Sequence, residues 1–298
     1  MGYDAKVLAD SVSEAGRRLT TIEARFPRFI LAEVNTHRML ARSSASSRAI
    51  PVEKRIIEVE ADPFVPESFG KNQRGMQALV DLEANEAQLA RQEWLLACRM
   101  ACSHAKTLAG LGVHKQLANR LIEPFAWHTA IITATDWDNF FNLRRGPEAQ
   151  PEFKRIADLM WEAREASLPM PVAVGEWHLP LIDDEDRSWA LCADPPGSFA
   201  DKLVRVSVAR CARVSYLTHD GRRDRAEDLA LYDRLVAPGH MSPLEHVARP
   251  MTARERELFV TRNLRGDAFG YYCGCFDGWV QHRKHVAGER VFERGTAK

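Results

Sequence analysis

The sequence lacks the features that would point to a membrane, to nucleic acid or to secretion. Its 41 Lys and Arg residues balance 41 Asp and Glu residues, so the chain as a whole has no excess charge that would favour nucleic acid as its main partner. No apolar run approaches the roughly 20 residues that a membrane-spanning helix needs. The first residues also lack the apolar core of a signal peptide. We therefore expect a cytoplasmic globular protein that binds neither membrane nor nucleic acid.

The sequence also lacks glycine-rich nucleotide-binding loops and cysteine patterns typical of disulfide frameworks or zinc sites. There is no Gly-x-Gly-x-x-Gly or Walker loop, which argues against a Rossmann-type dinucleotide site. The six cysteines are scattered through a long chain, which indicates reduced thiols rather than a disulfide framework. Cys98 and Cys102 lie four apart on an expected helix, where small buried apolar residues are the simpler interpretation. Cys273 and Cys275 have the wrong spacing for a zinc knuckle, and we expect no metal site.

A chain of 298 residues with 45% hydrophobic content can bury a large core in one or two domains. Alternating and β-branched stretches predict strands, and Ala-, Leu- and Glu-rich or amphipathic stretches predict helices. The expected strands are 19–26, 129–135 and 202–208. The expected helices are 76–111, 115–122, 152–166 and 225–235. A short helix is also expected to begin at about residue 28, and another to follow Asp136 as its N-cap.

The section 169–196 is rich in proline and carries the acidic run 183–186, which we expect to be a solvated face. It is the best candidate for a boundary between lobes. We expect one catalytic domain with three parts, namely a lobe at 1–168, a connecting insert at 169–200 and a segment at 201–298 that completes the fold.

Four short segments carry residues suited to chemistry: His37–Arg48, Asn139–Arg144, Cys211–Tyr216 and His240–His246. The first holds three arginines and four serines within twelve residues. Guanidinium groups and short hydroxyls are the side chains that hold phosphate oxygens. Taken singly, each segment favours a purely structural interpretation, such as a capped helix, a core histidine, a proline turn or a basic surface loop.

Together the segments resemble the flavin-dependent thymidylate synthases. That family has an Ala-Arg-Val-Ser element, a His-x-Ser/Thr-Pro-x-Glu-His turn and an Arg-His-Arg-x7-Ser-x-Arg signature, followed by Leu-Arg and Ala-Gln-x-Glu. The corresponding residues here are Ala212–Ser215, His240–His246, His37 and Arg38 with Ser46 and Arg48, Leu143–Arg144 and Ala149–Gln150, together with Arg120, which stands four residues before Pro124.

The resemblance has two departures. The Ala-Arg-Val-Ser element and the Ser-Pro-x-Glu-His turn normally precede the arginine signature but follow it here, which indicates a circular permutation. The signature also has Thr36 in place of its first arginine, Ser43-Ser44 in place of an asparagine–glutamate pair and Glu33 in place of a glutamine. We expect Gln281, Arg283 or Lys284, in the segment 279–284, to supply the charge that Thr36 cannot; a basic surface helix end is the alternative for that segment.

The resemblance implies an α+β fold, with a twisted, mainly antiparallel sheet flanked by long helices. It implies an FAD-dependent enzyme that transfers a one-carbon unit from methylenetetrahydrofolate to C5 of a pyrimidine deoxynucleoside monophosphate, in the first place deoxyuridylate giving thymidylate. NADPH would reduce the flavin, which lies between subunits of a homotetramer in the family. The cofactor would carry the hydride and methylene chemistry while the protein orients it, so no cysteine nucleophile is needed.

The resemblance also assigns roles to single residues. The monophosphate would be held by Arg48, Ser46, Ser44 and Arg120. Arg144 and Ser46 would be the catalytic residues, with Arg144 set against the pyrimidine ring to favour its N3-deprotonated form. The residues matching cofactor positions are His37, Arg38, Asn139 and Ser242 at the flavin and His240 near the folate, and we add Gln281 and Arg283.

Two alternatives stay open. Glu33 and Ser43-Ser44, near the expected base pocket, would suit a relative that acts on deoxycytidylate or adds a hydroxymethyl group, because a carboxylate accepts a hydrogen bond from the amine of cytosine. The loss of the first signature arginine would suit a homologue that binds flavin or nucleotide without catalysis.

Overall fold

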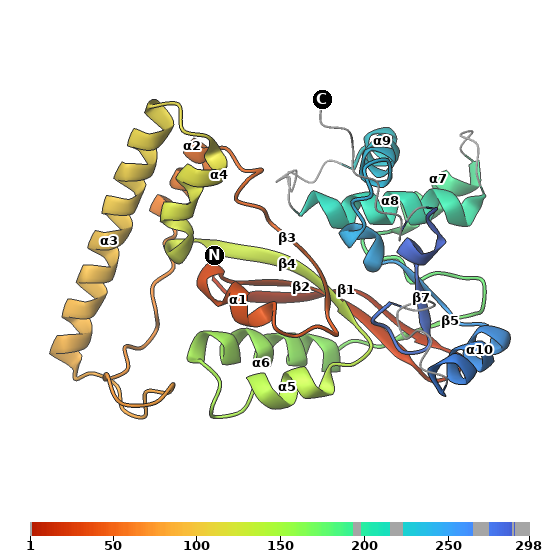
Figure 1. Ribbon diagram of the computed structural model, residues 1–298, viewed down its shortest axis with the longest axis horizontal. Coiled ribbons are helices and arrows are strands. Elements are labelled where there is room, and N and C mark those ends of the chain that lie inside the picture. The colour runs from red at the N-terminus through yellow and green to blue at the C-terminus, as the bar shows by residue number, and fades with distance from the viewer. Residues whose placement is uncertain (1, 193–197, 215–222, 265–273, 288, 290–298) are drawn as a thin grey trace.

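A five-stranded, mostly antiparallel sheet forms the centre of the protein (Figure 1). The computed structural model describes residues 2–192, 198–214, 223–264, 274–287 and 289, without the side chains of 260–264. The strand order is β3-β4-β2-β1-β5, and only β5 runs parallel to its neighbour. The strands are β1 (Asp4–Ser13), β2 (Arg18–Pro27), β3 (Ala41–Ser44), β4 (Trp127–Ala134) and β5 (Met170–Val172).

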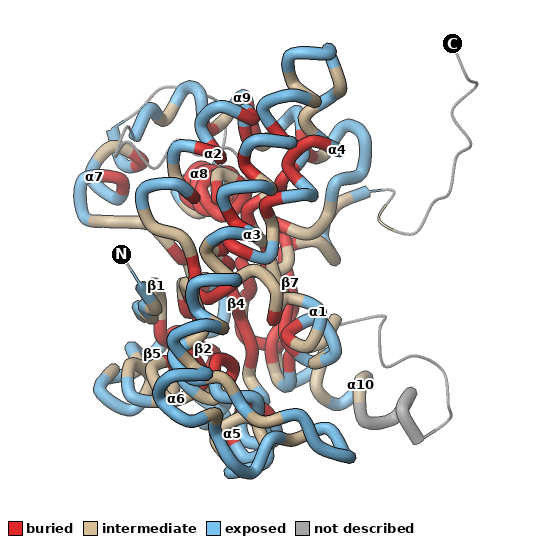
Figure 2. Tube along the Cα trace, turned by 90° about the vertical axis from the view of Figure 1, so that its left-hand side faces the viewer, coloured by how far each residue is buried: buried red, intermediate tan, exposed pale blue. Residues whose placement is uncertain are grey.

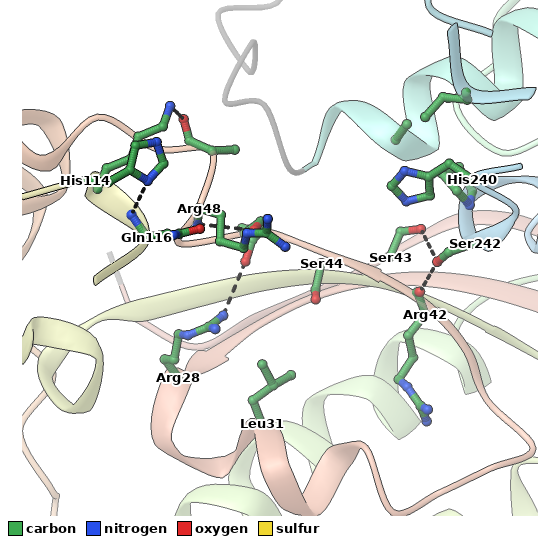
Figure 3. Close-up of a pocket in the computed structure, with 17 residues that line it drawn as sticks. Arg28, Leu31, Arg42, Ser43, Ser44, Arg48, His114, Gln116, His240 and Ser242 are labelled. Atoms are coloured by element: carbon green, nitrogen blue, oxygen red, sulfur yellow. Dashed lines mark hydrogen bonds between the residues drawn. The ribbon is translucent and has the colours of Figure 1, made fainter. Parts of the chain in front are cut away.

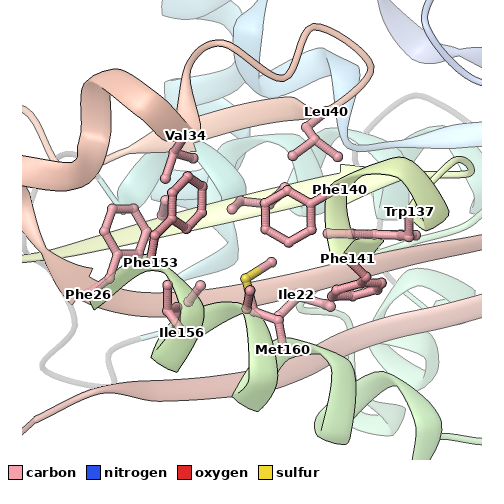
Figure 4. Close-up of a cluster of buried hydrophobic side chains, with 14 of the residues drawn as sticks. Ile22, Phe26, Val34, Leu40, Trp137, Phe140, Phe141, Phe153, Ile156 and Met160 are labelled. Carbon is pink, nitrogen blue, oxygen red and sulfur yellow. The ribbon is translucent and has the colours of Figure 1, made fainter. Parts of the chain in front are cut away.

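Alternation along β2 and β4 gives the sheet two covered faces. On one face the small and branched residues Ile22, Ala24, Ala130 and Ile132 are fully buried. They pack beneath α5 (Asp138–Arg144) and α6 (Pro151–Glu165). Figure 4 shows the aromatic and aliphatic side chains that fill this layer: Phe140, Phe141, Phe153, Ile156 and Met160 from the two helices. Pro151 fits the first turn of α6, where its missing N–H has no partner to lose.

The C-terminal third of the chain covers the other face of the sheet. Cys211 and Val214 pack on Ile131, and Phe276 and Trp279 pack with Leu19. Figure 2 shows buried residues gathered along α8 and the strands β2, β4 and β7. The elements of this part are α7 (Asp184–Cys192), α8 (Phe199–Arg213), α9 (Arg225–Val236), η3 (Ser242–Glu245), β6 (Ala248–Pro250), α10 (Ala253–Leu264), β7 (Trp279–Gln281) and η4 (His282–His285).

A separate group of helices extends the fold beyond one end of the sheet (Figure 1). It consists of α2 (Val52–Ala61), α3 (Ala84–Gly110), α4 (Lys115–Ala118) and η2 (Asn119–Phe125). The inner side of α3 places Cys98, Cys102 and Ala105 against this small core, as expected for the two cysteines. The remaining elements, η1 (Arg28–Ile30) and α1 (Leu31–Val34), lead from β2 toward β3. Within the described residues, no helix is both long and apolar enough to cross a membrane.

The structure confirms the α+β class and most predicted elements. The strands at 19–26 and 129–135 and the helices at 152–166 and 225–235 are present within one or two residues. The helix predicted at 115–122 is α4 continued as the tighter turns of η2, which contains Pro124. The section 169–196 is not wholly irregular, because it contains β5 and most of α7.

Three predictions of secondary structure were wrong. The segment 202–208 is not a strand but lies within α8, which Ser198 caps by accepting from the backbone N–H of Asp201 at 3.1 Å. The helix predicted from 76 begins at Ala84, because residues 70–82 form a loop closed by the bridge between Gly70 and Asp81. Asp136 is not an N-cap, since α5 begins two residues later without a side-chain cap.

The acidic run at 183–186 is not simply a solvated face. Asp186 is fully buried and accepts hydrogen bonds from Arg210 at 2.9 Å and from Arg225 at 2.8 Å. Arg210 also contacts the buried Asp228 at 3.0 Å, which in turn pairs with Arg213 at 2.6 Å. These arginines and carboxylates, which we call the buried ion network, join α7, α8 and α9.

Candidate functional site

A cavity of about 740 Å³ lies between β3 and the turn that contains Ser242 (Figure 3). We call it the first cavity. Its polar lining contains four cationic side chains, two histidines and four serines, and none of the described lining residues is a carboxylate. These residues are Arg28, Arg42, Arg48, Lys115, His114, His240, Ser43, Ser44, Ser46 and Ser242, with Gln116 beside them.

Hydrogen bonds between distant segments build this cavity. The Ser242 hydroxyl donates to the carbonyl of Arg42 at 2.9 Å and lies 3.5 Å from the Ser43 hydroxyl, which fixes the C-terminal turn on β3. On the other side, the Asn119 amide donates to the carbonyls of Ser47 and Ile50 at 2.8 and 2.9 Å. The loop after β3 is thereby held open along the cavity.

The cations of the first cavity differ in how they are bound. Arg28 contacts Glu123 at 3.1 Å and donates to the carbonyl of Ala45 at 3.2 Å, and burial lowers its pKa. Arg42 turns its guanidinium away from the Ser242 turn (Figure 3) and donates to the carbonyls of Val34 and His37. The other two cations of the lining, Lys115 and Arg48, have fewer contacts within the protein.

Lys115 donates to the carbonyl of Ala49 at 2.9 Å. The side chain of Arg48 is exposed and has no hydrogen bond or ion pair with another described residue. The backbone N–H of Arg48 donates to the Ser46 hydroxyl at 3.2 Å. A guanidinium without a carboxylate, beside ordered hydroxyls, is an arrangement suited to an oxyanion.

A second cavity, of about 530 Å³, adjoins the first and shares Arg42 and Ser242 with it. Arg38, Gln281 and Arg283 line it. Here the charges are paired, since Arg283 bonds to Glu245 and, at 3.0 Å, to Glu289. Its wall requires a glycine at position 274, because a Cβ there would come within 1.7 Å of the Gln281 side-chain oxygen.

Three predicted site residues lie outside both cavities. Arg144 donates through Nε to His37 Nε2 at 2.8 Å, and its guanidinium lies 4.5 Å from the centre of the Phe153 ring. Burial, with the charges of Arg144 and Arg42, lowers the pKa of His37 to about 4, so this imidazole is a neutral acceptor. Asn139 is exposed on α5.

Arg120 and Glu33 are also not brought into the first cavity. Arg120 lines a third cavity, of about 410 Å³, which shares Arg28 and Leu31 with the first, and donates to both carboxylate oxygens of Glu123, at 3.0 and 3.1 Å. Glu33 lies half-buried on α1 and lines neither cavity. The structure therefore brings together Ser44, Ser46, Arg48, His240 and Ser242 in the first cavity, and Arg38, Ser242, Gln281 and Arg283 in the second.

Sequence reasoning missed Arg28, Lys115, His114 and Gln116. Arg28 follows Pro27 at the end of β2, and its role depends on contacts with Glu123 and with His128, 100 residues away. The other three stand at the start of α4, where His114 Nδ1 accepts from the backbone N–H of Gln116 at 3.3 Å. An N-cap residue such as His114 can indicate from the sequence where a helix begins, but not that the residue lines a cavity.

The fold and the first cavity define an α+β protein whose central sheet borders a cavity lined by cations and hydroxyls. The family model of the thymidylate synthase complementing proteins, Thy1, matches residues 18–170, just over half of the chain. The chain therefore belongs to this family and is a flavin-dependent thymidylate synthase-like enzyme. The match ends at β5, so Ala212–Ser215 and His240–His246 lie outside it.

Solved structures give a more distant likeness. A UMP/dUMP methylase, PolB from Streptomyces cacaoi, bound with 5-Br UMP, is 17% identical with a TM-score of 0.46, over 54% of this chain and 88% of that chain. The flavin-dependent thymidylate synthase ThyX from Helicobacter pylori, complexed with FAD and dUMP, is 16% identical with a TM-score of 0.34, over 49% of this chain and 67% of that one. No curated protein matches the chain.

Proposed function

We propose that this enzyme transfers a one-carbon unit from methylenetetrahydrofolate to C5 of a pyrimidine deoxynucleoside monophosphate, converting deoxyuridylate to thymidylate. FAD and NADPH would take part as in its family. The observation that carries the proposal is the first cavity, whose described lining has four cations and four serines but no carboxylate. A site of this composition favours a doubly charged phosphate over a neutral or cationic ligand.

Arg48 and the two serines beside it are the proposed phosphate ligands. The Arg48 guanidinium is exposed at the cavity, and Ser44 and Ser46 line the same wall. A guanidinium can bind two phosphate oxygens at once, and a hydroxyl can donate to a third. Lys115 joins this set in our proposal in place of Arg120, because Arg120 lies in another cavity and is bound by Glu123.

The second cavity is the proposed place for part of the flavin. Arg38 lines it and is exposed, so this guanidinium would bind an anionic group of a dinucleotide, whereas Arg283 and Lys284 are already paired with carboxylates. When bound, the flavin would supply the redox and one-carbon chemistry. The chain's own contribution would be to orient it with Ser242, which lies in the wall shared with the first cavity, and to balance its charge.

Arg144 lies outside both cavities of its own chain, where it is bound by His37. We therefore propose that it acts against the pyrimidine ring in the cavity of a second copy, within the expected homotetramer. There a fixed guanidinium would stabilise negative charge that develops on the ring. The neutral His37 would hold Arg144 in place by accepting its Nε–H.

The changed order of the motifs supports a circular permutation in our proposal. The Ser242 turn, which follows the signature in the sequence, lies on β3 directly beside the signature segment. The segment 201–298 would then complete a single catalytic domain with the lobe 1–168, joined by the insert 169–200.

Deoxycytidylate is a second candidate substrate because Ser43 and Ser44, which stand where the family has asparagine and glutamate, both line the first cavity. A hydroxyl can donate to O4 of uracil or accept from the amine of cytosine. Glu33 does not contribute to this argument, since it lines neither cavity.

The visible absorption spectrum of the purified protein tests the proposal. We expect an oxidised-flavin band that bleaches when NADPH is added without oxygen, and faster bleaching in the presence of deoxyuridylate than of deoxycytidylate. The reverse preference would make deoxycytidylate the substrate. A colourless protein that takes up no added FAD would overturn the proposal.

A further inference from the structure

Five buried polar side chains form one continuous row of hydrogen bonds between the sheet and its C-terminal cover. We call the row the polar seam. Its four distances lie within hydrogen-bond range: Ser11 Oγ to His178 Nδ1 at 2.8 Å, His178 Nε2 to Thr21 Oγ1 at 2.7 Å, Thr21 Oγ1 to Thr133 Oγ1 at 2.7 Å, and Thr133 Oγ1 to His246 Nδ1 at 2.8 Å. None of the five residues is more than 6% exposed.

The sheet contributes three residues to the seam and the cover contributes two. Thr21 and Thr133 are register partners on β2 and β4, and Ser11 on β1 is paired with Leu19, two residues along β2 from Thr21. The three hydroxyls therefore share one face of the sheet. His178 comes from the connection between β5 and α7, for which the sequence indicated no role. His246 directly follows the Ser242–Glu245 turn.

Each of these side chains depends on its neighbours, because a buried polar group without a partner is costly. The bonds to His178 and His246 therefore help to fix where the cover lies on the sheet. His178 is tied further by its backbone N–H, which donates to the carbonyl of Ala248 at 2.8 Å. The turn that carries Ser242 is thus anchored at its far end by His246 and the seam.

Hydrogen counting restricts the direction of the seam. Burial lowers the pKa of His178 and of His246 to about 3, so each ring has one N–H and one lone pair. A threonine hydroxyl has a single hydrogen to donate. We require all four bonds to form and the hydroxyl hydrogens of Thr21 and Thr133 to be donated within the seam. Only two arrangements then remain. In one, every residue donates toward His246; in the other, every residue donates toward Ser11.

The two directions differ at His246. Its Nε2 is buried and has no hydrogen-bond partner among the described residues. A seam that starts at Ser11 would leave a bare N–H fixed at this atom. A seam that starts at His246 would leave a lone pair there and would free the hydroxyl hydrogen of Ser11, which can rotate toward another acceptor. Buried N–H groups without acceptors are the rarer of the two defects in proteins.

We propose that the seam runs from His246 to Ser11, with both imidazoles protonated at Nδ1, and that His246 is the positioning residue through which the seam holds the Ser242 turn in the wall of the two cavities. The effect on ligand binding rests on the proposed function. The direction of the seam does not, because it follows from the hydrogen-bond distances and from the burial of His246 Nε2.

The ring ¹⁵N shifts of histidine, measured by NMR on the full chain near pH 7, test the direction. His178→Gln and His246→Gln variants identify the two rings by the loss of their signals. We expect the Nδ1–H tautomer for both, because the seam has a single direction. The Nε2–H tautomer at either ring, or rapid exchange between tautomers, would overturn the proposed direction.

Thr133→Val tests the positioning role, because it removes the middle of the seam while keeping the size of the side chain. We expect His246 to lose its single tautomer and the affinity for deoxyuridylate to fall about tenfold, equivalent to roughly one hydrogen bond. Thr20→Val is the matched control. Thr20 is equally buried but lies on the opposite face of β2 and bonds to Asp10 at 3.1 Å.

The control should lose comparable stability and keep both the tautomers and the affinity. Equal losses of affinity in the two variants would overturn the positioning role, as would unchanged affinity in Thr133→Val. If the unmodified protein bound no nucleotide, the proposed function would fail. The tautomers of His178 and His246 would then still decide the direction of the seam.

Discussion

Arginine is used in opposite ways in the buried ion network and in the first cavity. In the network, Arg210 lies between two fully buried carboxylates, Asp186 and Asp228. In the first cavity, no carboxylate of the part of the chain that the structure describes pairs with Arg48, and hydroxyls line the same wall. A guanidinium whose donors are all used inside the protein holds elements together, whereas one without a partner is available to a ligand. The distinction lies in the surrounding carboxylates and not in the arginine itself.

Removing the central arginine of the network should have the largest effect. Arg210→Met leaves two buried carboxylates without their main partner, and we expect the free energy of unfolding to fall by about 3–5 kcal/mol. Urea unfolding measures this loss. Arg187→Met is the control, because Arg187 is exposed on the same helix as Asp186 and should change stability by less than about 0.5 kcal/mol. Similar losses in both variants would show that the network does not hold these helices.

Acid should weaken the network next. Burial alone would raise the pKa of Asp186, but hydrogen bonds from Arg210 and Arg225 hold it below its usual value. A carboxyl whose pKa is lowered in the folded state stabilises the protein at pH values above its pKa in the unfolded chain, which is about 3.9. That contribution is lost as the pH falls below 4, on the order of 2 kcal/mol.

Urea unfolding at pH 5 and pH 3 compares the natural chain with Asp186→Asn. The variant should show a smaller loss of stability between the two pH values, because its amide cannot take up a proton. An equal loss in both proteins would mean that Asp186 does not contribute to the acid dependence.

Arg48→Ala should produce the opposite pattern from Arg210→Met. We expect stability to stay within about 0.5 kcal/mol while the affinity for deoxyuridylate falls roughly 10- to 100-fold, the worth of a hydrogen bond to a charged group. Isothermal titration calorimetry measures the affinity. Arg99→Ala, on the exposed side of α3, controls for the loss of one positive charge from the surface. A stability loss without loss of affinity would assign Arg48 to the structure instead of the ligand.

Adding a carboxylate to the first cavity should make it resemble the network. Gln116→Glu places a negative charge beside Lys115 and in the same lining as Arg48. We expect about a fivefold loss of nucleotide affinity, reduced in high salt because the site is open to solvent. Gln92→Glu, exposed on α3, should leave the affinity unchanged. A tighter complex in the Gln116 variant would argue against an anionic ligand.

The sheet could be predicted because its strands carry the signal locally. The alternation and β-branching of 19–26 and 129–135 match a strand whatever packs on it. The segment 202–208 failed because Val204, Val206 and Val208 also alternate, while the helix that holds them is buried on nearly every side. A buried helix has no polar face from which to read its period.

The site could be predicted only in part. The arginines and serines of 37–48 indicate a phosphate site, and Ser44, Ser46 and Arg48 do line the first cavity. Arg120 was expected there as well, but its partner Glu123 stands three residues away in a turn whose shape the sequence does not reveal. Lys115 and Arg28 enter the site through the folding of distant segments, which leaves no local trace.

The wall between the two cavities also sets when the enzyme can first function during its synthesis. Ser43 and Ser242 are 199 residues apart in the chain, a stretch that a ribosome takes roughly 10 to 40 s to make. Until then, β2 and β4 present Leu19, Thr21, Ile131 and Thr133, all fully buried in the finished protein, on an uncovered face. The newly made sheet therefore stays uncovered until then, and the proposed nucleotide site is complete only after the final quarter of the chain has begun to emerge.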